Sequence, residues 1–213
     1  MCNQEHNRVE ELDLSRNELT GKLPPVLANL TALKVLKLVE NHFYDIIPTA
    51  LSSLRQLRLL QLDTNSLQRI IPPTLGQLTD IFKLDLSYNK LTGKIPQEIS
   101  GMRGIRMFLN LSHNNLDGPM PIELSKLENV EEIDVSSNNL TGIIFPEISN
   151  CSSLRKINFS HNSLRDNLPD SVGNLKNLEA FDVSGNNISG RIPTSLKKIQ
   201  QVESSIQLQN CHF

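Results

Sequence analysis

The stretch LDLSYNKLTGKIP, residues 84–96, contains the pattern that decides the fold. Its asparagine, Asn89, is one of eight that recur along the chain at gaps of 24, 24, 24, 25, 24, 24 and 24 residues. The series is Asn17, Asn41, Asn65, Asn89, Asn114, Asn138, Asn162 and Asn186. A fixed period of this size is typical of an array built from one supersecondary unit, so the sequence predicts a solenoid.

Apolar residues keep fixed distances from each asparagine. In the quoted stretch, Leu84 and Leu86 alternate with polar residues, which is the pattern of a strand with one buried face. Between one strand and the next, apolar residues recur at intervals of three, as in LGQLTDI at residues 75–81, and this spacing indicates a 3₁₀ or helical turn. One unit cannot bury its own apolar residues, so the coils must stack.

The asparagines themselves have a predicted structural role. At the corner after each strand, buried backbone N–H and C=O groups need hydrogen-bond partners, and a primary amide supplies both donors and an acceptor. We therefore expect all eight to lie inside the turns as a ladder of amides.

The full pattern is L-x-x-L-x-L-S-x-N-x-L-T-G-x-I-P-x-x-L-x-x-L, and it recurs as IDVSSNNLTG at residues 133–142. It resembles the plant-specific leucine-rich repeats of receptor-like kinases, receptor-like proteins and secreted polygalacturonase inhibitors. The resemblance implies an α/β fold class: a right-handed solenoid of 24-residue repeats with a parallel concave β-sheet and a 3₁₀ or irregular convex side. It also implies that the Leu-Thr-Gly-x-Ile-Pro segment forms a second, short strand beside the concave sheet.

The two ends of the chain suggest the domain boundaries. CNQEHNR at residues 2–8 resembles the end of the N-terminal cap of such ectodomains, so residues 1–8 are expected to be a cap remnant. Residues 9–213 then form the repeat domain, with eight repeats and a truncated ninth that starts near Ile206 after one inserted residue. The incomplete last coil predicts fraying of residues 200–213, or self-association through that uncapped end.

The cysteines show no evident disulfide pairing. Cys151 occupies a position held by leucine in other repeats, which predicts a buried apolar role, whereas Cys2 and Cys211 would lie at opposite ends of the solenoid. This usage by itself would permit a reduced, intracellular protein. The net charge of −2 gives no basic field for nucleic acid or anionic lipid.

Two sequons are credible N-glycosylation sites. Asn29 and Asn150 are expected on the convex side, whereas Asn110 and Asn158 would point from strands into the concave sheet, where a glycan would obstruct the face.

Catalysis is not predicted. Asp-x-Ser pairs recur at the same position in several repeats, which favours a structural role, because catalysis needs one asymmetric arrangement of groups. His113 and His161 are two coils apart, or roughly 10 Å at normal strand spacing, too far to share a metal ion. We expect no enzyme, no metal site and no cofactor.

The candidate binding residues are those that depart from the repeat consensus. Repeats two and three differ at outward-facing positions and replace the loop glycine by Asp45 and Arg69. The predicted ligand-binding residues of the concave or lateral face are Val35, Lys37, Val39, Glu40, His42, Tyr44, Leu59, Gln61, Asp63, Tyr88 and Phe108. Three of them, Val35, Val39 and Leu59, are expected to form an exposed apolar patch rimmed by charge. Neutral drift in a degenerate array is the alternative explanation.

The resemblance implies a non-catalytic recognition module, the ligand-binding part of a plant receptor-like kinase or receptor-like protein. Its partners would be a protein or peptide ligand and a co-receptor, with no nucleic acid and no membrane contact by this segment. The module would lie on the extracellular face of the plasma membrane or be secreted, although the chain contains no signal peptide or membrane-spanning stretch. A secreted inhibitor of a cell-wall hydrolase and an intracellular scaffold are the alternatives.

Overall fold

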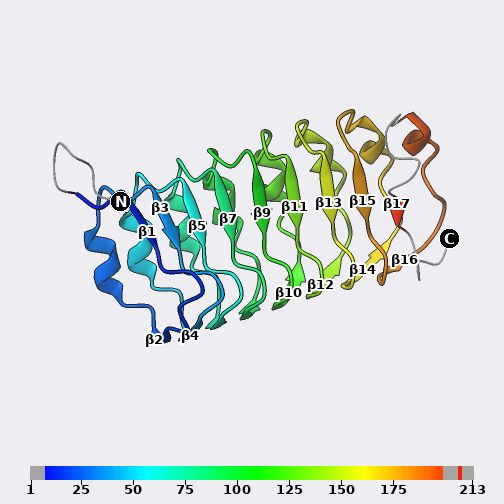
Figure 1. The fold of residues 1–213 in the computed structure, drawn as a ribbon. Helices are drawn as coiled ribbons and strands as arrows, with labels where there is room; N and C mark the ends of the chain where they lie inside the picture. Colours follow the sequence, from blue (N-terminus) through cyan, green and yellow to red (C-terminus); the bar gives the residue numbers. More distant parts are fainter. Residues whose placement is uncertain (1–7, 199–205, 208–213) are drawn as a thin grey trace.

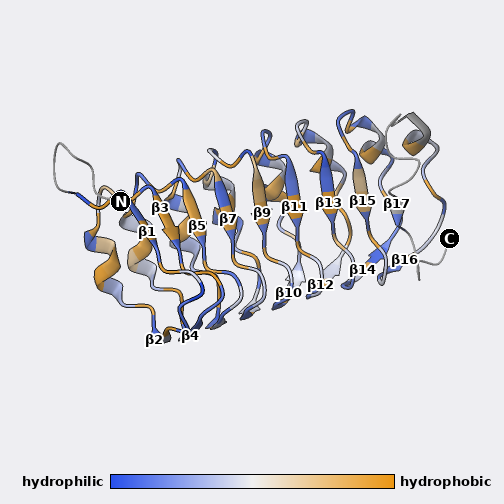
Figure 2. Ribbon diagram, in the orientation of Figure 1, coloured by the Kyte–Doolittle hydropathy of each residue, from blue (hydrophilic) through white to orange (hydrophobic). Residues whose placement is uncertain are grey.

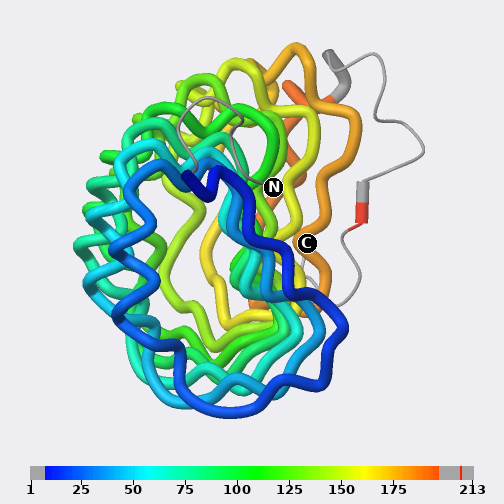
Figure 3. The backbone as a smooth tube through the Cα atoms, turned by 60° about the vertical axis from the view of Figure 1, so that its left-hand side comes forward, coloured from blue at the N-terminus to red at the C-terminus, as the bar shows by residue number. Residues whose placement is uncertain are grey.

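The computed structural model describes residues 8–198 and 206–207. These residues form a row of similar coils stacked along one axis, with the first and last described coils at opposite ends of the row (Figure 1). In a view turned toward that axis, successive coils nearly superpose and rotate gradually from one to the next (Figure 3). The solenoid predicted from the asparagine period is therefore confirmed.

Within the described residues, nine strands form a parallel sheet in chain order, called the concave sheet below. Its strands are β1 (Glu11–Asp13), β3 (Val35–Lys37), β5 (Leu59–Gln61), β7 (Lys83–Asp85), β9 (Phe108–Asn110), β11 (Glu132–Asp134), β13 (Lys156–Asn158), β15 (Ala180–Asp182) and β17 (Ile206–Gln207). Each strand pairs with the next so that equivalent leucines stack, as Leu36, Leu60 and Leu84 do. All three leucines are buried, which confirms the one-sided alternation predicted for these strands (Figure 2).

A second parallel sheet follows the asparagine corner, as the Leu-Thr-Gly-x-Ile-Pro segment predicts. In the described part of the chain it has eight strands: β2 (Thr20–Lys22), β4 (His42–Asp45), β6 (Ser66–Arg69), β8 (Lys90–Gly93), β10 (Asn115–Pro119), β12 (Asn139–Gly142), β14 (Ser163–Asp166) and β16 (Asn187–Ile188). This sheet forms the lateral face of the solenoid, along the lower side of Figure 1.

The convex side consists of 3₁₀ helices, again as expected. They are η1 (Pro25–Asn29), η2 (Thr49–Ser53), η3 (Pro73–Gln77), η4 (Gln97–Gly101), η5 (Ile122–Lys126), η6 (Pro146–Asn150), η7 (Asp170–Asn174) and η8 (Thr194–Lys198). Pro48, Pro72 and Pro96 stand directly before η2, η3 and η4, where the fixed φ of proline suits the extended residue that precedes a turn.

Cys151 is fully buried on this side of the core, as its leucine-like position predicts. Its thiol donates a weak hydrogen bond to the carbonyl oxygen of Leu124, with an Sγ to O distance of 3.4 Å. Burial raises the pKa of the Cys151 thiol to about 12, so the group stays protonated and acts as a small apolar residue.

The amide ladder is present, and its geometry explains why an asparagine recurs at the same place in each coil. The Nδ2 group of Asn89 donates to the carbonyl oxygens of Leu86 and Ser87 in its own coil, and to that of Leu62 in the preceding coil. Its Oδ1 atom accepts a hydrogen bond from the backbone N–H of Leu67 at 2.9 Å. Each amide therefore joins two coils and satisfies four backbone groups at the corner.

Six other asparagines of the series repeat this bonding set: Asn41, Asn65, Asn114, Asn138, Asn162 and Asn186. The prediction was wrong for Asn17, which is exposed and whose side-chain amide donates only to the carbonyl oxygen of Ser15 among the described residues. Asn17 stands in the first described coil, so no preceding described coil supplies the carbonyl that its amide would bond.

Two positions per coil have left-handed backbone. The residue before each ladder asparagine has positive φ, for example 50° at Tyr88 and 52° at His113. The second position lies at or near the end of the short lateral strand, and glycine fills it in most coils. Asp45, Arg69 and Asp166 hold φ values of 72°, 68° and 68° there, although side chains disfavour this region.

The single 25-residue gap in the asparagine series corresponds to a bulge. In an ordinary coil, the residue before the strand bonds closely to the coil below, as the N–H of Arg58 does to the carbonyl oxygen of Lys34 at 2.8 Å. Before β9, the N–H groups of Arg106 and Met107 both point to the carbonyl oxygen of Phe82 at 3.4 Å. Phe108 pairs with Lys83 and Glu132, while Arg106 aligns with Phe82 and Glu131, so the inserted residue is Met107, next to the first residue of β9.

An insertion of the same size precedes β17, since Phe181 pairs with Ile206 in place of residue 205. This agrees with the inserted residue expected there. Cys2, Cys211 and most of the segment 200–213, on which the fraying and self-association predictions depend, lie outside the described residues.

Candidate functional site

The aliphatic patch expected on the concave sheet is less exposed than the sequence suggests. Val35 and Leu59 are paired in register on β3 and β5, so they do lie side by side. Both are half-buried, however, as is Val39. The prediction that these three side chains form an exposed patch was therefore wrong in degree, because neighbouring side chains on parallel strands about 4.8 Å apart cover one another.

The charged candidates of repeat two are already paired. The Nζ atom of Lys37 lies 3.4 Å from Asp13 Oδ2 and 3.6 Å from Glu11 Oε1. The Glu40 carboxylate forms an exposed ion pair with Arg16 at 2.9 Å. These partners precede them by one coil, so a ligand at this end would have to compete with existing ion pairs.

Asp63 is the most perturbed group of the candidate set. The Asp63 side chain is half-buried, and its Oδ1 atom has no hydrogen-bond partner among the described residues. Burial, together with the negative charge of Asp85, raises the pKa of Asp63 to about 6. Burial also raises the pKa of Asp85, which accepts a hydrogen bond from the Ser87 hydroxyl at 2.7 Å.

His42 and Tyr44 belong to the lateral face and not to the concave sheet. Both lie on β4, and both are exposed. Tyr44 is followed by Asp45, whose carboxylate forms an ion pair with Lys22 at 2.7 Å. The candidate residues therefore fall on two adjacent faces that meet at the asparagine corner.

The aromatic candidates make specific contacts farther along the concave sheet. The ring of Tyr88 stacks on that of His113, with centroids 4.0 Å apart and planes inclined by 14°. Phe108 is half-buried, and the Nζ atom of Lys83 lies 5.2 Å from its ring centroid. These contacts bring repeats four and five together as a second candidate area.

The sequence reasoning missed the most exposed apolar residues near that area. Phe82 and Met107 have exposed fractions of 43% and 52%, and they flank the start of β7 and β9. Two signals could have identified them: Phe82 replaces the charged residue that most repeats carry seven positions before the asparagine, and Met107 is the inserted residue.

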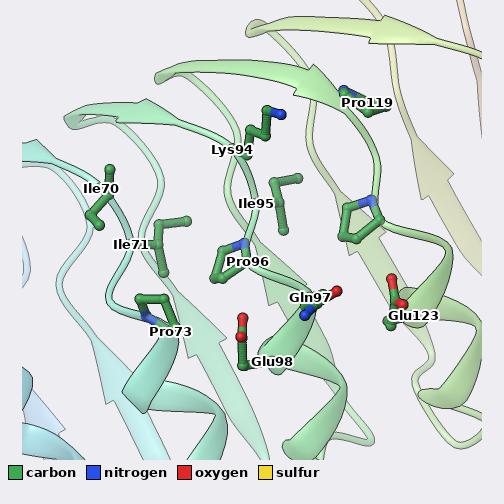
Figure 4. Close-up of a pocket in the computed structure, with 11 residues that line it drawn as sticks. Ile70, Ile71, Pro73, Lys94, Ile95, Pro96, Gln97, Glu98, Pro119 and Glu123 are labelled. Carbon is green, nitrogen blue, oxygen red and sulfur yellow. The ribbon is translucent and has the colours of Figure 1, made fainter.

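A shallow groove of about 530 Å³ lies where the lateral face turns into the convex side (Figure 4). Its lining is mainly apolar and comes from three successive coils, with Ile70, Pro96 and Pro119 among the residues. Lys94 and Glu98 bring opposite charges to its edges. None of the binding residues predicted from the sequence lies in this groove.

The Asp-x-Ser pairs have the structural role that their recurrence predicts. The backbone N–H of Ser136 donates to Asp134 Oδ1 at 2.9 Å, and Ser184 donates to Asp182 in the same way. Such bonds close a tight turn after the strand.

The two glycosylation candidates, Asn29 and Asn150, are exposed at the ends of η1 and η6. Their modification stays a prediction.

The family of the chain follows from its match to models described as Leucine rich repeat, over residues 7–67, 55–116 and 128–188, with a further match over residues 107–127. The chain belongs to the leucine-rich repeat family.

Among its relatives is a putative leucine-rich repeat receptor-like serine/threonine-protein kinase of Arabidopsis thaliana. The two are 50% identical over 42 residues, which cover 20% of this chain and 4% of that protein.

Solved structures of plant receptor ectodomains match over nearly the whole chain. One is the ectodomain of the Arabidopsis thaliana receptor kinase GASSHO1/SCHENGEN3 in complex with CASPARIAN STRIP INTEGRITY FACTOR 2, with 34% identity and a TM-score of 0.91. Another is the Arabidopsis receptor kinase HAESA in complex with the peptide hormone IDA and the co-receptor SERK1, with 31% identity and a TM-score of 0.84. Each match covers 95% of this chain, but only 24% and 38% of those chains. The resemblance to plant receptor ectodomains is therefore confirmed, and the chain spans a minor part of their length.

Proposed function

We propose that this chain is the ligand-recognising part of a plant leucine-rich repeat receptor, and that it binds a peptide or a protein segment. The observation that carries the proposal is the match of 95% of the chain to receptor ectodomains solved in complex with CASPARIAN STRIP INTEGRITY FACTOR 2 and with the peptide hormone IDA. A co-receptor, such as the one present in the HAESA complex, is a second candidate partner.

The concave sheet and the adjoining lateral face form the proposed binding surface. Val35 and Leu59 supply apolar area, and Asp63 supplies a carboxyl group with an unpartnered oxygen among the described residues. Tyr44 on β4 and Tyr88 at the asparagine corner add exposed aromatic area to this surface. A ligand that covers half-buried aliphatic side chains between polar margins has the anatomy of a typical interface.

The module would be non-catalytic and extracellular, with any kinase domain of the receptor outside these residues. No helix in the described part of the chain is long and apolar enough to cross a membrane. The similarity to receptor ectodomains favours this assignment over a secreted hydrolase inhibitor, and over an intracellular scaffold.

Selection of a displayed library of random dodecapeptides against the chain tests the proposal. Replacing Val35 and Leu59 together by serine should weaken binding of the selected peptides tenfold or more, because apolar anchors usually dominate binding energy. The matched control is Val26→Ser with Ile122→Ser, two exposed residues of the convex side, and it should leave binding unchanged. Equal affinities of the two double variants, with unchanged circular dichroism, would remove the concave sheet from the binding surface.

A further inference from the structure

The residues directly before the concave strands form a continuous column on one margin of the sheet, called the rim below. From the second coil on, each residue of the column donates its backbone N–H to the carbonyl oxygen of the residue one coil earlier. The column consists of Glu10, Lys34, Arg58, Phe82, Arg106, Glu131, Arg155 and Glu179. Side chains on this column are spaced by one coil, or about 4.8 Å.

Charges at both ends of the rim neutralise each other. Lys34 forms an ion pair with Glu10 at 2.9 Å, and Arg155 forms one with Glu179 at 2.6 Å. At the centre this alternation breaks, because Phe82 separates two exposed arginines, Arg58 and Arg106. Neither arginine has a carboxylate partner within 4.0 Å among the described residues.

Exposed apolar area lies beside these two cations. Phe82 is 43% exposed, and the bulge turns the inserted Met107 outward with an exposed fraction of 52%. Phe108 continues the apolar area into the concave sheet. Lys83 adds no free cation here, because it lies over the Phe108 ring and near the carboxylates of the sheet.

We propose that this central rim, made of Arg58, Phe82, Arg106 and Met107, binds an extended acidic peptide segment that carries a bulky apolar side chain between two carboxylates. The inference rests on the proposed function and specifies the ligand class. Arg58 and Arg106 lie on either side of an exposed apolar area, so their charges are complementary to two carboxylates that flank an apolar side chain.

The spacing of the rim defines the motif. Arg58 and Arg106 are two coils apart, or roughly 10 Å along the rim. In an extended peptide, residues i, i+2 and i+4 face the same side and span roughly 13 Å, a difference that long arginine side chains can bridge. The expected motif is therefore acid-x-apolar-x-acid. Glu131, exposed in the next coil, would repel a third acidic residue and so limits the segment at this end.

Selection of the dodecapeptide library also tests this inference. The unaltered chain should enrich peptides with the acid-x-apolar-x-acid motif. The charge-reversed variant Arg58→Glu with Arg106→Glu should lose this enrichment and favour lysine or arginine at the same two positions. Arg165→Glu with Arg191→Glu alters two exposed arginines outside the rim by the same total charge, and it should keep the acidic motif.

The apolar part of the site has its own matched pair of variants. Phe82→Ser with Met107→Ser should weaken binding of the selected peptides at least tenfold, whereas Val26→Ser with Ile122→Ser should not. Circular dichroism of each variant checks that the fold is retained.

The outcomes separate this inference from the proposed function. If the selected peptides lack the acidic motif, but their binding is lost in the double variant Val35→Ser with Leu59→Ser, the inference is overturned and the proposed function still stands. A library that yields no binding peptide counts against both. A dimer of the unaltered chain in sedimentation, dissociated by Phe82→Ser with Met107→Ser, would assign the rim to a second copy and also overturn the inference.

Discussion

The ring of Tyr88 stacks on the imidazole ring of His113 one coil away, with centroids 4.0 Å apart. Each of the two residues directly precedes a ladder asparagine and holds a left-handed backbone conformation. The amides of Asn89 and Asn114 anchor these corners in register, so the position before each asparagine presents its side chain at the same place in every coil. Stacking of the two rings is thus a consequence of the amide ladder.

A double-mutant cycle measures this contact. Tyr88→Ala and His113→Ala should show a coupling free energy of about 0.5–1 kcal/mol in urea unfolding, as expected for a partly exposed ring pair. Tyr88→Ala with His161→Ala is the control, because His161 lies two coils beyond His113, and its coupling should be near zero. Equal coupling in the two cycles would contradict direct stacking.

The amide ladder should be costly to interrupt inside the array and cheap to interrupt at its first member. Asn89→Ala leaves four backbone groups of two coils without partners and should lower the free energy of unfolding by about 2–4 kcal/mol. Asn17→Ala should cost less than about 1 kcal/mol, because Asn17 is exposed and its amide donates one bond. Chemical denaturation of the two variants tests this, and similar losses would show that the exposed first corner is as tightly held as the buried ones.

Asp63 makes stability depend on pH. Burial raises its pKa from 3.8 to about 6, so the folded chain holds this proton more tightly than the unfolded chain does. The resulting stabilisation is fully present below about pH 4 and is lost as the pH rises through about 6. Because Asp63 keeps some contact with solvent, the loss should be about 1 kcal/mol, less than the full pKa difference implies.

The variant Asp63→Asn isolates this effect. Its stability relative to the unaltered chain should rise between pH 4 and pH 7, as measured by thermal or urea unfolding at each pH. Asp117→Asn, at an exposed position of β10, is the matched control for loss of one carboxylate. A constant difference between Asp63→Asn and the unaltered chain across this range would show that the carboxyl titrates alike in both states.

Arg69 occupies a left-handed position that glycine fills in most coils. Its φ is 68°, and its side chain is exposed with no ion pair among the described residues. Arg69→Gly should therefore stabilise the fold by about 0.5–1 kcal/mol. The reverse change, Gly93→Ala, should cost about 1 kcal/mol, since the added Cβ would lie 3.0 Å from Ile70 Cγ2 at a φ of +74°. Denaturant unfolding measures both variants, and midpoints that shift in the same direction in Arg69→Gly and Gly93→Ala would contradict this prediction.

The asparagine period and the apolar spacing around it were sufficient to predict the concave sheet, the 3₁₀ turns and the amide ladder, whereas the second sheet was expected from the family resemblance. Each rests on a pattern that every coil repeats, so errors at one position do not change the result. The failure at Asn17 has a physical cause. Each ladder amide needs a carbonyl oxygen in the preceding coil, and the repeat pattern alone does not say whether a preceding coil supplies one.

The candidate binding surface was harder to predict. Departure from consensus identified Tyr88 and Phe108, but it overestimated the exposure of Val35 and Leu59, since coverage by adjacent strands depends on the size of side chains 24 residues away. Departure from consensus also did not identify the rim, because Arg58 is distinguished there only by having no ion pair among the described residues. Pairing between coils is a property of three-dimensional neighbours, and the period alone does not give it.

An array of nearly identical coils offers a ligand several equivalent alignments, each displaced by one coil from the next. Such translational degeneracy would let a bound chain slide along the surface. Within residues 8–198, the inserted Met107 occurs in one coil alone, so a ligand that contacts it has a single alignment. One additional amino acid thereby gives a periodic surface an origin from which positions can be counted.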